Sequence, residues 1–119
     1  MAVEQAQLAL RLSPSDPLIY LPYVSLAYAH FAARRFEEAA AAASRASQSN
    51  PRFSVPYMLH TAALAELGRS DDAKAMAQRL LELEPGTTIS TAIRSARYAN
   101  PENIAALRSA LRKAGLPEE

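Results

Sequence analysis

Apolar and polar residues along this 119-residue chain recur with a helical period, in segments of helix length. Four of these segments are the clearest, at residues 22–33, 36–49, 56–67 and 70–83. Short polar or glycine-containing steps at 34–35 and 68–69 separate the two members of each pair. Because a helix with one apolar face buries that face against another element, the pattern predicts two antiparallel helix pairs that pack on each other.

The two pairs repeat each other at an interval of 34 residues. Three sets of landmarks keep this interval: Pro22 and Pro56, Pro51 and Pro85, and the triplets EEA at 37–39 and DDA at 71–73. Proline suits the first turn of a helix, where its missing N–H would have no partner, so the first set predicts helix starts. The second set predicts helix ends, because the residue before a proline disfavours helical backbone. The fixed interval indicates a repeat array.

The segment before these pairs carries half of a unit. Residues 2–14 match a second helix, with alanines and a proline at a constant offset of 37 from those at 39–51. An unpartnered second helix would expose an apolar stripe, since stacked repeats bury their faces against their neighbours. We therefore expect this chain to be a piece of a longer array.

The segment after the pairs carries a degraded unit. Thr87 or Thr88 can cap a helix that reaches about residue 98, and Asn100-Pro101 can begin a last helix that reaches about residue 114. The bend between them comes early compared with the other units, so we expect residues 87–115 to form a capping repeat at an altered angle.

Together these segments predict one all-helical domain over residues 1–119, a right-handed α-solenoid of about seven helices in antiparallel pairs. Its units would be the half-unit at 2–14, repeats at 20–51 and 54–85, and the cap at 87–115.

Composition narrows the possible functions. Half of the residues are apolar, yet Trp is absent and only 7% are aromatic, which favours close-packed helices. There is no cysteine, so disulfides and thiolate sites are excluded, and a net charge of +1 gives no drive toward nucleic acid. No apolar run is long enough to cross a bilayer, and Glu4 interrupts any signal peptide. We therefore expect a cytoplasmic protein without nucleic-acid or membrane partners.

The repeat resembles the tetratricopeptide repeat family, whose unit carries an early aromatic, a Gly at the bend, spaced alanines and a terminal proline. The matching positions are Tyr23 and Tyr57, Phe36, Ala39 and Ala73, Ala46, Pro51 and Pro85. The departures are Arg34 at the position of Gly68, Ser70 in place of an aromatic, and Leu80 in place of an alanine. The resemblance covers about residues 2–115 and implies a protein-interaction scaffold.

A narrower resemblance concerns three short sequence segments, LRKAGLPEE, SNPRFSVPY and LLELEPG. They are similar to C-terminal repeat arrays of some bacterial class III adenylate or guanylate cyclases. That resemblance implies a regulatory or partner-binding tail, because no cyclase residues are present.

Candidate chemistry is sparse. His30 and His60 are the only histidines, and neither has the further ligands of a metal site or the orienting carboxylate of a general base. We expect both to be packed, hydrogen-bonded core residues, and we expect no enzyme activity and no cofactor. Several basic residues gather in the C-terminal unit and are interpreted as a solvated face: Arg94, Arg97, Arg108, Arg112 and Lys113.

The most informative set of residues is apolar. In tetratricopeptide arrays the first helices line a concave wall, and the resemblance places on it Leu21, Val24, Tyr28, Phe31, Val55, Met58, Ala62, Ile89, Ala92 and Ile93. An apolar groove of this kind suits a peptide, an amphipathic helix or the parent protein. Two alternatives stay open: the stripe is buried between stacked units, or it pairs copies of the chain as a homodimer.

Overall fold

The computed structural model describes residues 20–95 and 101–117, and these residues form helices without any strand. The helices are α2 (Tyr20–Ala32), α3 (Phe36–Ser49), α4 (Val55–Glu66), α5 (Ser70–Leu83), α6 (Ile89–Ser95) and α7 (Pro101–Lys113). The prediction of an all-helical chain is confirmed. The helix expected over residues 2–14 lies outside the described residues.

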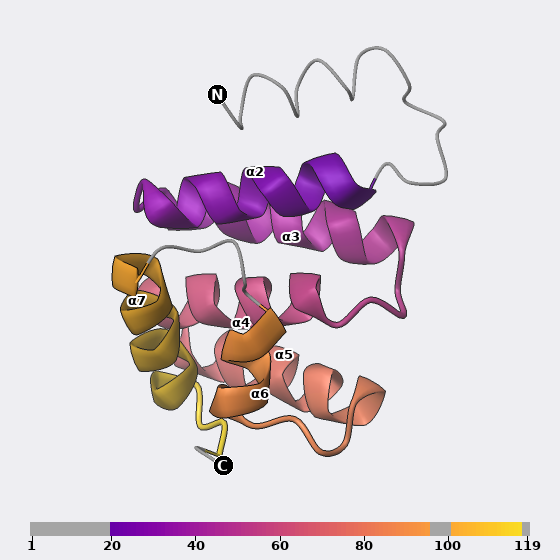
Figure 1. The fold of residues 1–119 in the computed structure, drawn as a ribbon, viewed down its shortest axis with the longest axis vertical. Helices are drawn as coiled ribbons and strands as arrows, with labels where there is room; N and C mark the ends of the chain where they lie inside the picture. The colour runs from indigo at the N-terminus through magenta and orange to yellow at the C-terminus, as the bar shows by residue number, and fades with distance from the viewer. Residues whose placement is uncertain (1–19, 96–100, 118–119) are drawn as a thin grey trace.

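Neighbouring helices pack in pairs along the chain. Helix α2 packs against α3, α3 against α4, and α4 against α5. Figure 1 shows α2 in front of α3, with α4 and α5 continuing the back layer. Helices α3, α4 and α5 each bury a set of small or apolar residues in this stack.

The bends between paired helices share one backbone geometry. In each bend the chain passes through a residue with positive φ, at Arg34 (61°) and at Gly68 (76°). The residue after each of these donates its backbone N–H to a carbonyl in the last turn of the preceding helix. Arg35 donates to the carbonyl of His30 (2.8 Å), and Arg69 donates to the carbonyl of Leu64 (3.0 Å). This is the Schellman arrangement, which satisfies carbonyls at a helix end.

Prolines begin the first helices as the sequence predicts. Pro22 lies in the first turn of α2, and Pro56 is the second residue of α4. The turn before α4 is tied to that helix, because the Tyr57 hydroxyl donates a hydrogen bond to the carbonyl of Pro51 at 3.0 Å. A proline-containing turn is thus held against the helix that follows it.

Alanine makes the close contacts between paired helices possible. Ala39, Ala43 and Ala46 of α3 are fully buried, and so is Ala73 of α5. Small side chains let helix axes approach closely, so the abundance of alanine is a packing feature.

The C-terminal unit departs from this stacking. Helix α6 is capped by Thr88 and Thr91, whose hydroxyls each accept a hydrogen bond from the other residue's N–H (3.2 and 2.8 Å). Helix α7 begins at Pro101 and then packs against α4 and α6. In Figure 1, α6 and α7 both lie in front of α4.

Two contacts fasten the end of this unit. The N–H of Ile89 donates to the carbonyl of Pro117 at 2.8 Å, so the chain after α7 returns to the start of α6. Lys113 of α7 forms an ion pair with Glu66 of α4 at 3.0 Å. The C-terminal unit is thereby closed on itself and on α4.

Candidate functional site

The side chains expected to line an open apolar wall lie mostly in the core. Met58 is 2% exposed and Ile89 is fully buried. The other buried members of the set are Val24, Phe31, Val55, Ala62 and Ala92, while Tyr28 and Ile93 are half-buried. Leu21 lies in α2, and its side chain is outside the described part of the structure.

The C-terminal unit contributes to this burial on α4, against which α7 packs. Leu107, Ala110 and Leu111 of α7 belong to the same apolar cluster as Met58 and Val24, with no exposed area of their own. Their spacing is that of one helix face, and α7 packs against α4 and α6. Most side chains of the expected wall are therefore buried in this structure. A role of its residues in binding stays a prediction.

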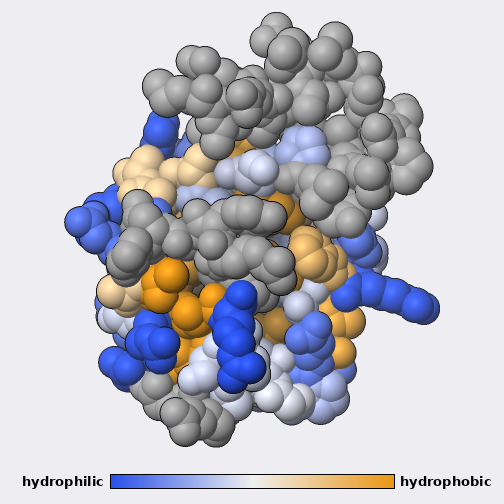
Figure 2. Space-filling model, in the orientation of Figure 1, coloured by the Kyte–Doolittle hydropathy of each residue, from blue (hydrophilic) through white to orange (hydrophobic). Residues whose placement is uncertain are grey.

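A small apolar surface, called the seam below, lies between α6 and α7 in the C-terminal unit. Figure 2 shows apolar residues gathered between α6 and α7, with charged residues around them. Ile93 of α6 and Ile104 of α7 are half-buried. This surface is narrow, because most apolar side chains of the two helices turn inward.

Tyr28 occupies an unusual position within the predicted wall. Its hydroxyl is buried and has no hydrogen-bond partner in the described residues. Burial raises the pKa of this phenol to about 12, because the phenolate would lose its hydration. Tyr28 thus stays neutral and acts as a packing residue with one unsatisfied polar group.

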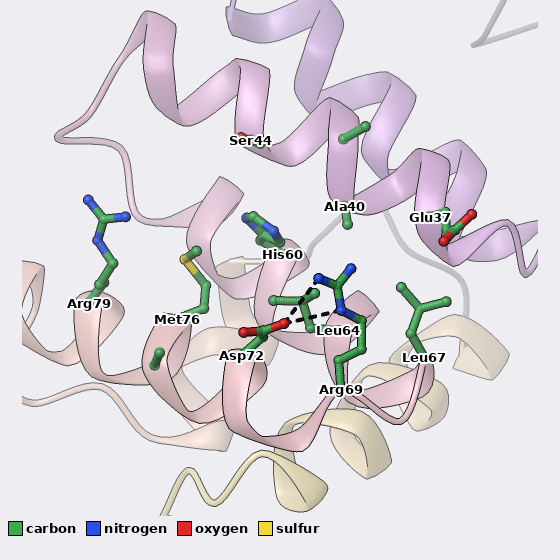
Figure 3. Close-up of a pocket in the computed structure, with 12 residues that line it drawn as sticks. Glu37, Ala40, Ser44, His60, Leu64, Leu67, Arg69, Asp72, Met76 and Arg79 are labelled. Carbon is green, nitrogen blue, oxygen red and sulfur yellow. Dashed lines mark hydrogen bonds and ion pairs between the residues drawn. The ribbon is translucent and has the colours of Figure 1, made fainter.

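A groove of about 520 Å³ lies between α3 and α5, above α4. Figure 3 shows side chains from all three helices turned toward this space. Its floor is formed by His60 and Leu64 of α4 and by Leu67, which directly follows that helix. The lower part of the groove is apolar, since Leu64 is only 5% exposed and Leu67 is half-buried.

The walls of the groove are built from small and flexible side chains. Helix α3 contributes Glu37, Ala40, Ala41 and Ser44, and helix α5 contributes Asp72, Ala75, Met76 and Arg79. On both helices the spacing is i, i+3, i+4 and i+7, so each wall is a single helix face. The two alanines at the same repeat position, Ala41 and Ala75, are exposed.

Charges lie at the two ends of this groove. At one end, Arg69 pairs with Asp72 at 3.1 Å, and both side chains are 57% exposed. Glu37 lies at that same end, while Arg79 lies at the other (Figure 3). Because Arg69 and Asp72 compensate each other, the groove has an acidic end at Glu37 and a basic end at Arg79.

His60 lies between these charges. Its pKa is lowered, first by burial and then by the positive charges of Arg69 and Arg79, with Asp72 opposing them. The ring is therefore neutral near pH 7. The expectation of two hydrogen-bonded core histidines is wrong: His60 faces the groove, and the buried Nδ1 of His30 has no hydrogen-bond partner in the described residues. Helix patterning places a histidine on a face but does not supply its partner.

The basic residues of the C-terminal unit are not a single free patch. Lys113 pairs with Glu66, Arg94 is exposed, and Arg97 lies outside the described residues. Arg108 is half-buried, which fits a solvated helix flank.

Within residues 20–95 and 101–117, no three His, Cys, Asp or Glu side chains gather as a metal ion would need. In the same part of the chain, none of the helices has the length and apolar content to cross a membrane. The groove contains one neutral imidazole, a compensated ion pair, and the charges of Glu37 and Arg79 at its two ends.

Sequence reasoning missed this groove because it lies on the second helices, whereas the family resemblance directed attention to the first. One signal was available in the sequence. The segments at 36–49 and 70–83 are rich in polar residues, and each carries small or flexible side chains on one flank: Ala40, Ala41 and Ser44 on the first and Ala75 and Met76 on the second. Comparison with protein-family models, curated proteins and solved structures finds no match to this chain.

Proposed function

We propose that this chain is a non-catalytic interaction module, a tetratricopeptide-like right-handed solenoid segment that binds another protein. The observation that carries the proposal is the groove between α3 and α5, whose floor is apolar and whose walls are helix faces. Helical repeats leave such surfaces between successive units, and binding through a rigid array face is their usual use.

The composition of the groove supports contact rather than chemistry. A general base needs an orienting partner and a nucleophile bonded to it; Asp72 and Ser44 line the same groove, but among the described residues no hydrogen bond joins either of them to His60. Met76 and Leu67 instead offer adaptable apolar surface, which favours protein recognition.

Self-association of the chain is the second candidate function. The half-buried Ile93 and Ile104 at the seam between α6 and α7 favour it, because a second copy could complete their burial. A role as a regulatory tail of a nucleotide cyclase stays a prediction from the narrower resemblance.

Affinity capture from an extract of the source cells, with the full chain as bait, tests the proposal. We expect wild-type chain to retain one or a few proteins, in stoichiometric amount, that an exposed-surface control such as Ala105→Tyr also retains. Sedimentation over a wide concentration range measures self-association in parallel. A chain that stays monomeric and retains no protein would contradict the function.

A further inference from the structure

The groove between α3 and α5 has the features of a binding site for one more helix. Each wall is a helix face with i, i+3, i+4 and i+7 spacing, and the residues from Glu37 to Ser44 make it about 10 Å long, or two helical turns. Rows with this spacing form ridges and grooves into which the side chains of another helix pack.

Small side chains let such a helix approach closely. Ala40 is buried, and Ala41 and Ala75 present only methyl groups on opposite walls. The floor below them, Leu64 and Leu67, can receive one or two apolar side chains of medium size. Helix association is favoured where backbones approach closely over an apolar floor.

The lining groups disfavour an extended peptide. An extended chain brings its own N–H and C=O groups, which need partners at the surface that receives it. The walls and floor here are helices, whose backbone groups are already bonded within each helix. A helical occupant satisfies its own backbone and needs only side-chain contacts.

The charges indicate what the occupant carries at its ends. Glu37 at one end has no ion-pair partner among the described residues, and the same is true of Arg79 at the other. Because the Arg69–Asp72 pair is self-compensated, a bound helix meets one net negative end and one net positive end.

On the basis of the proposed function, we propose that this groove binds an amphipathic helix of a partner protein. The helix carries a basic residue over Glu37, an acidic residue over Arg79, and Leu- or Met-sized side chains on the face between them. Its apolar residues contact Leu64, Leu67 and Met76, and its backbone lies against Ala41 and Ala75.

Three synthetic helical peptides of about four turns test this inference. They share one two-turn apolar face of leucines at i, i+3, i+4 and i+7 and differ only in the charged residues that directly flank this face: Lys on one side and Glu on the other, Lys on both sides, or Glu on both sides. Fluorescence anisotropy with the full chain gives the affinities. We expect the mixed-charge peptide to bind about two- to fivefold more tightly than the others, the size of exposed ion-pair effects.

Charge reversal in the protein gives a sharper readout. Glu37→Lys makes both ends basic, so the preference should move to the peptide with Glu on both sides. Arg79→Glu makes both ends acidic, so it should move to the peptide with Lys on both sides. Nonspecific binding of the peptides would not change the charge preference in opposite directions in the two variants.

A filled groove provides the steric test. Ala41→Tyr places a large side chain in the wall, and we expect at least about tenfold weaker binding of the mixed-charge peptide. Ala105→Tyr is the matched control, because Ala105 is equally classed as exposed but lies on α7 outside the groove lining. Equal binding by both variants, or no preference among the peptides, would overturn the inference.

The outcomes separate this inference from the proposed function. If a cellular protein is retained equally by wild type and Ala41→Tyr, the chain is a binding module but the groove is not its site. If Ala41→Tyr instead abolishes concentration-dependent dimers, the occupant is a second copy, and a partner helix is ruled out.

Discussion

At the scale of single residues, the two bends present the same geometry with different side chains. Arg34 has a φ of 61° and Gly68 a φ of 76°, and both lie at the same repeat position. A left-handed backbone costs an L-residue about 1–2 kcal/mol, whereas glycine adopts it freely. The first bend is therefore strained and the second is not.

Exchanging these residues should change stability in opposite directions. We expect Arg34→Gly to raise the free energy of unfolding by about 0.5–1 kcal/mol, part of the relief being lost to glycine's greater freedom in the unfolded chain. Gly68→Arg should lower it by about 1 kcal/mol, with no steric clash, since no atom lies within 4 Å of a Cβ built at Gly68. Urea denaturation measures both. Changes of the same sign would show that the bends are not equivalent.

His60 makes a prediction about pH. Its pKa in the folded chain lies below the usual 6.5, through burial and the charges of Arg69 and Arg79, with Asp72 opposing and Glu37 on the facing helix. Well above pH 6.5 the imidazole is neutral in both states and adds no pH dependence to stability. As pH falls below 6.5, the unfolded chain takes up the proton first, so stability falls until the folded pKa is passed.

The variant His60→Gln should remove this part of the pH dependence. We expect the difference in unfolding free energy between wild type and His60→Gln to be constant well above pH 6.5 and to shift against wild type as the pH falls through 6.5 toward the lowered pKa of the folded chain. Parallel stability curves across this range would mean that the groove leaves the imidazole fully solvated.

At the scale of helices, small residues decide how closely the pairs pack. Ala39 and Ala73 occupy the same repeat position and are both fully buried. Ala39 lies in the main apolar cluster, and Ala73 lies with Leu64 and Ala114 in a smaller one. The smaller cluster joins α5, α4 and the end of α7.

Enlarging either alanine should overpack the contact. We expect Ala39→Leu and Ala73→Leu each to lower the free energy of unfolding by about 1–3 kcal/mol. Ala41→Leu is the matched control on the same helix as Ala39, because Ala41 is exposed and its change should stay within about 0.5 kcal/mol. Thermal denaturation of the three variants gives the comparison, and equal melting temperatures would refute the assigned faces.

Particular residues show how far the sequence predicts these elements. The prolines, the alanines and the 34-residue interval predict α3 and α5 at their observed bounds, because local backbone preference and helical period act over a few turns. The return of α7 onto α4 was not predicted. Leu107 and Leu111 reveal an apolar face, but periodicity does not tell which other element covers it.

At the scale of the whole molecule, this return makes the chain compact. The Cα radius of gyration is 13.2 Å, close to the value of about 13.5 Å expected for a compact domain of this length. The C-terminal unit packs against α4, and the ion pair of Lys113 with Glu66 joins α7 to that helix. The groove proposed for binding is lined by α3, α4 and α5 and by no residue of the C-terminal unit.

Because α7 shares the core, it should unfold together with the rest. Leu111 has no exposed area, so we expect Leu111→Ala to lower the free energy of unfolding by about 2–5 kcal/mol. Circular dichroism during urea denaturation should show one transition, shifted to lower urea. Two separate transitions would mean that α7 is only loosely attached.

The most direct measurement is the free energy of unfolding of Met58→Lys beside that of Ala41→Lys. Met58 is 2% exposed beneath the C-terminal unit, whereas Ala41 is on the wall of the open groove. If the first helices form the core, Met58→Lys loses several kcal/mol or fails to fold, because the charge is buried without a partner. Ala41→Lys should then stay within about 0.5 kcal/mol of wild type. Near-wild-type stability of Met58→Lys would contradict the account and reopen the wall of the first helices as a binding surface.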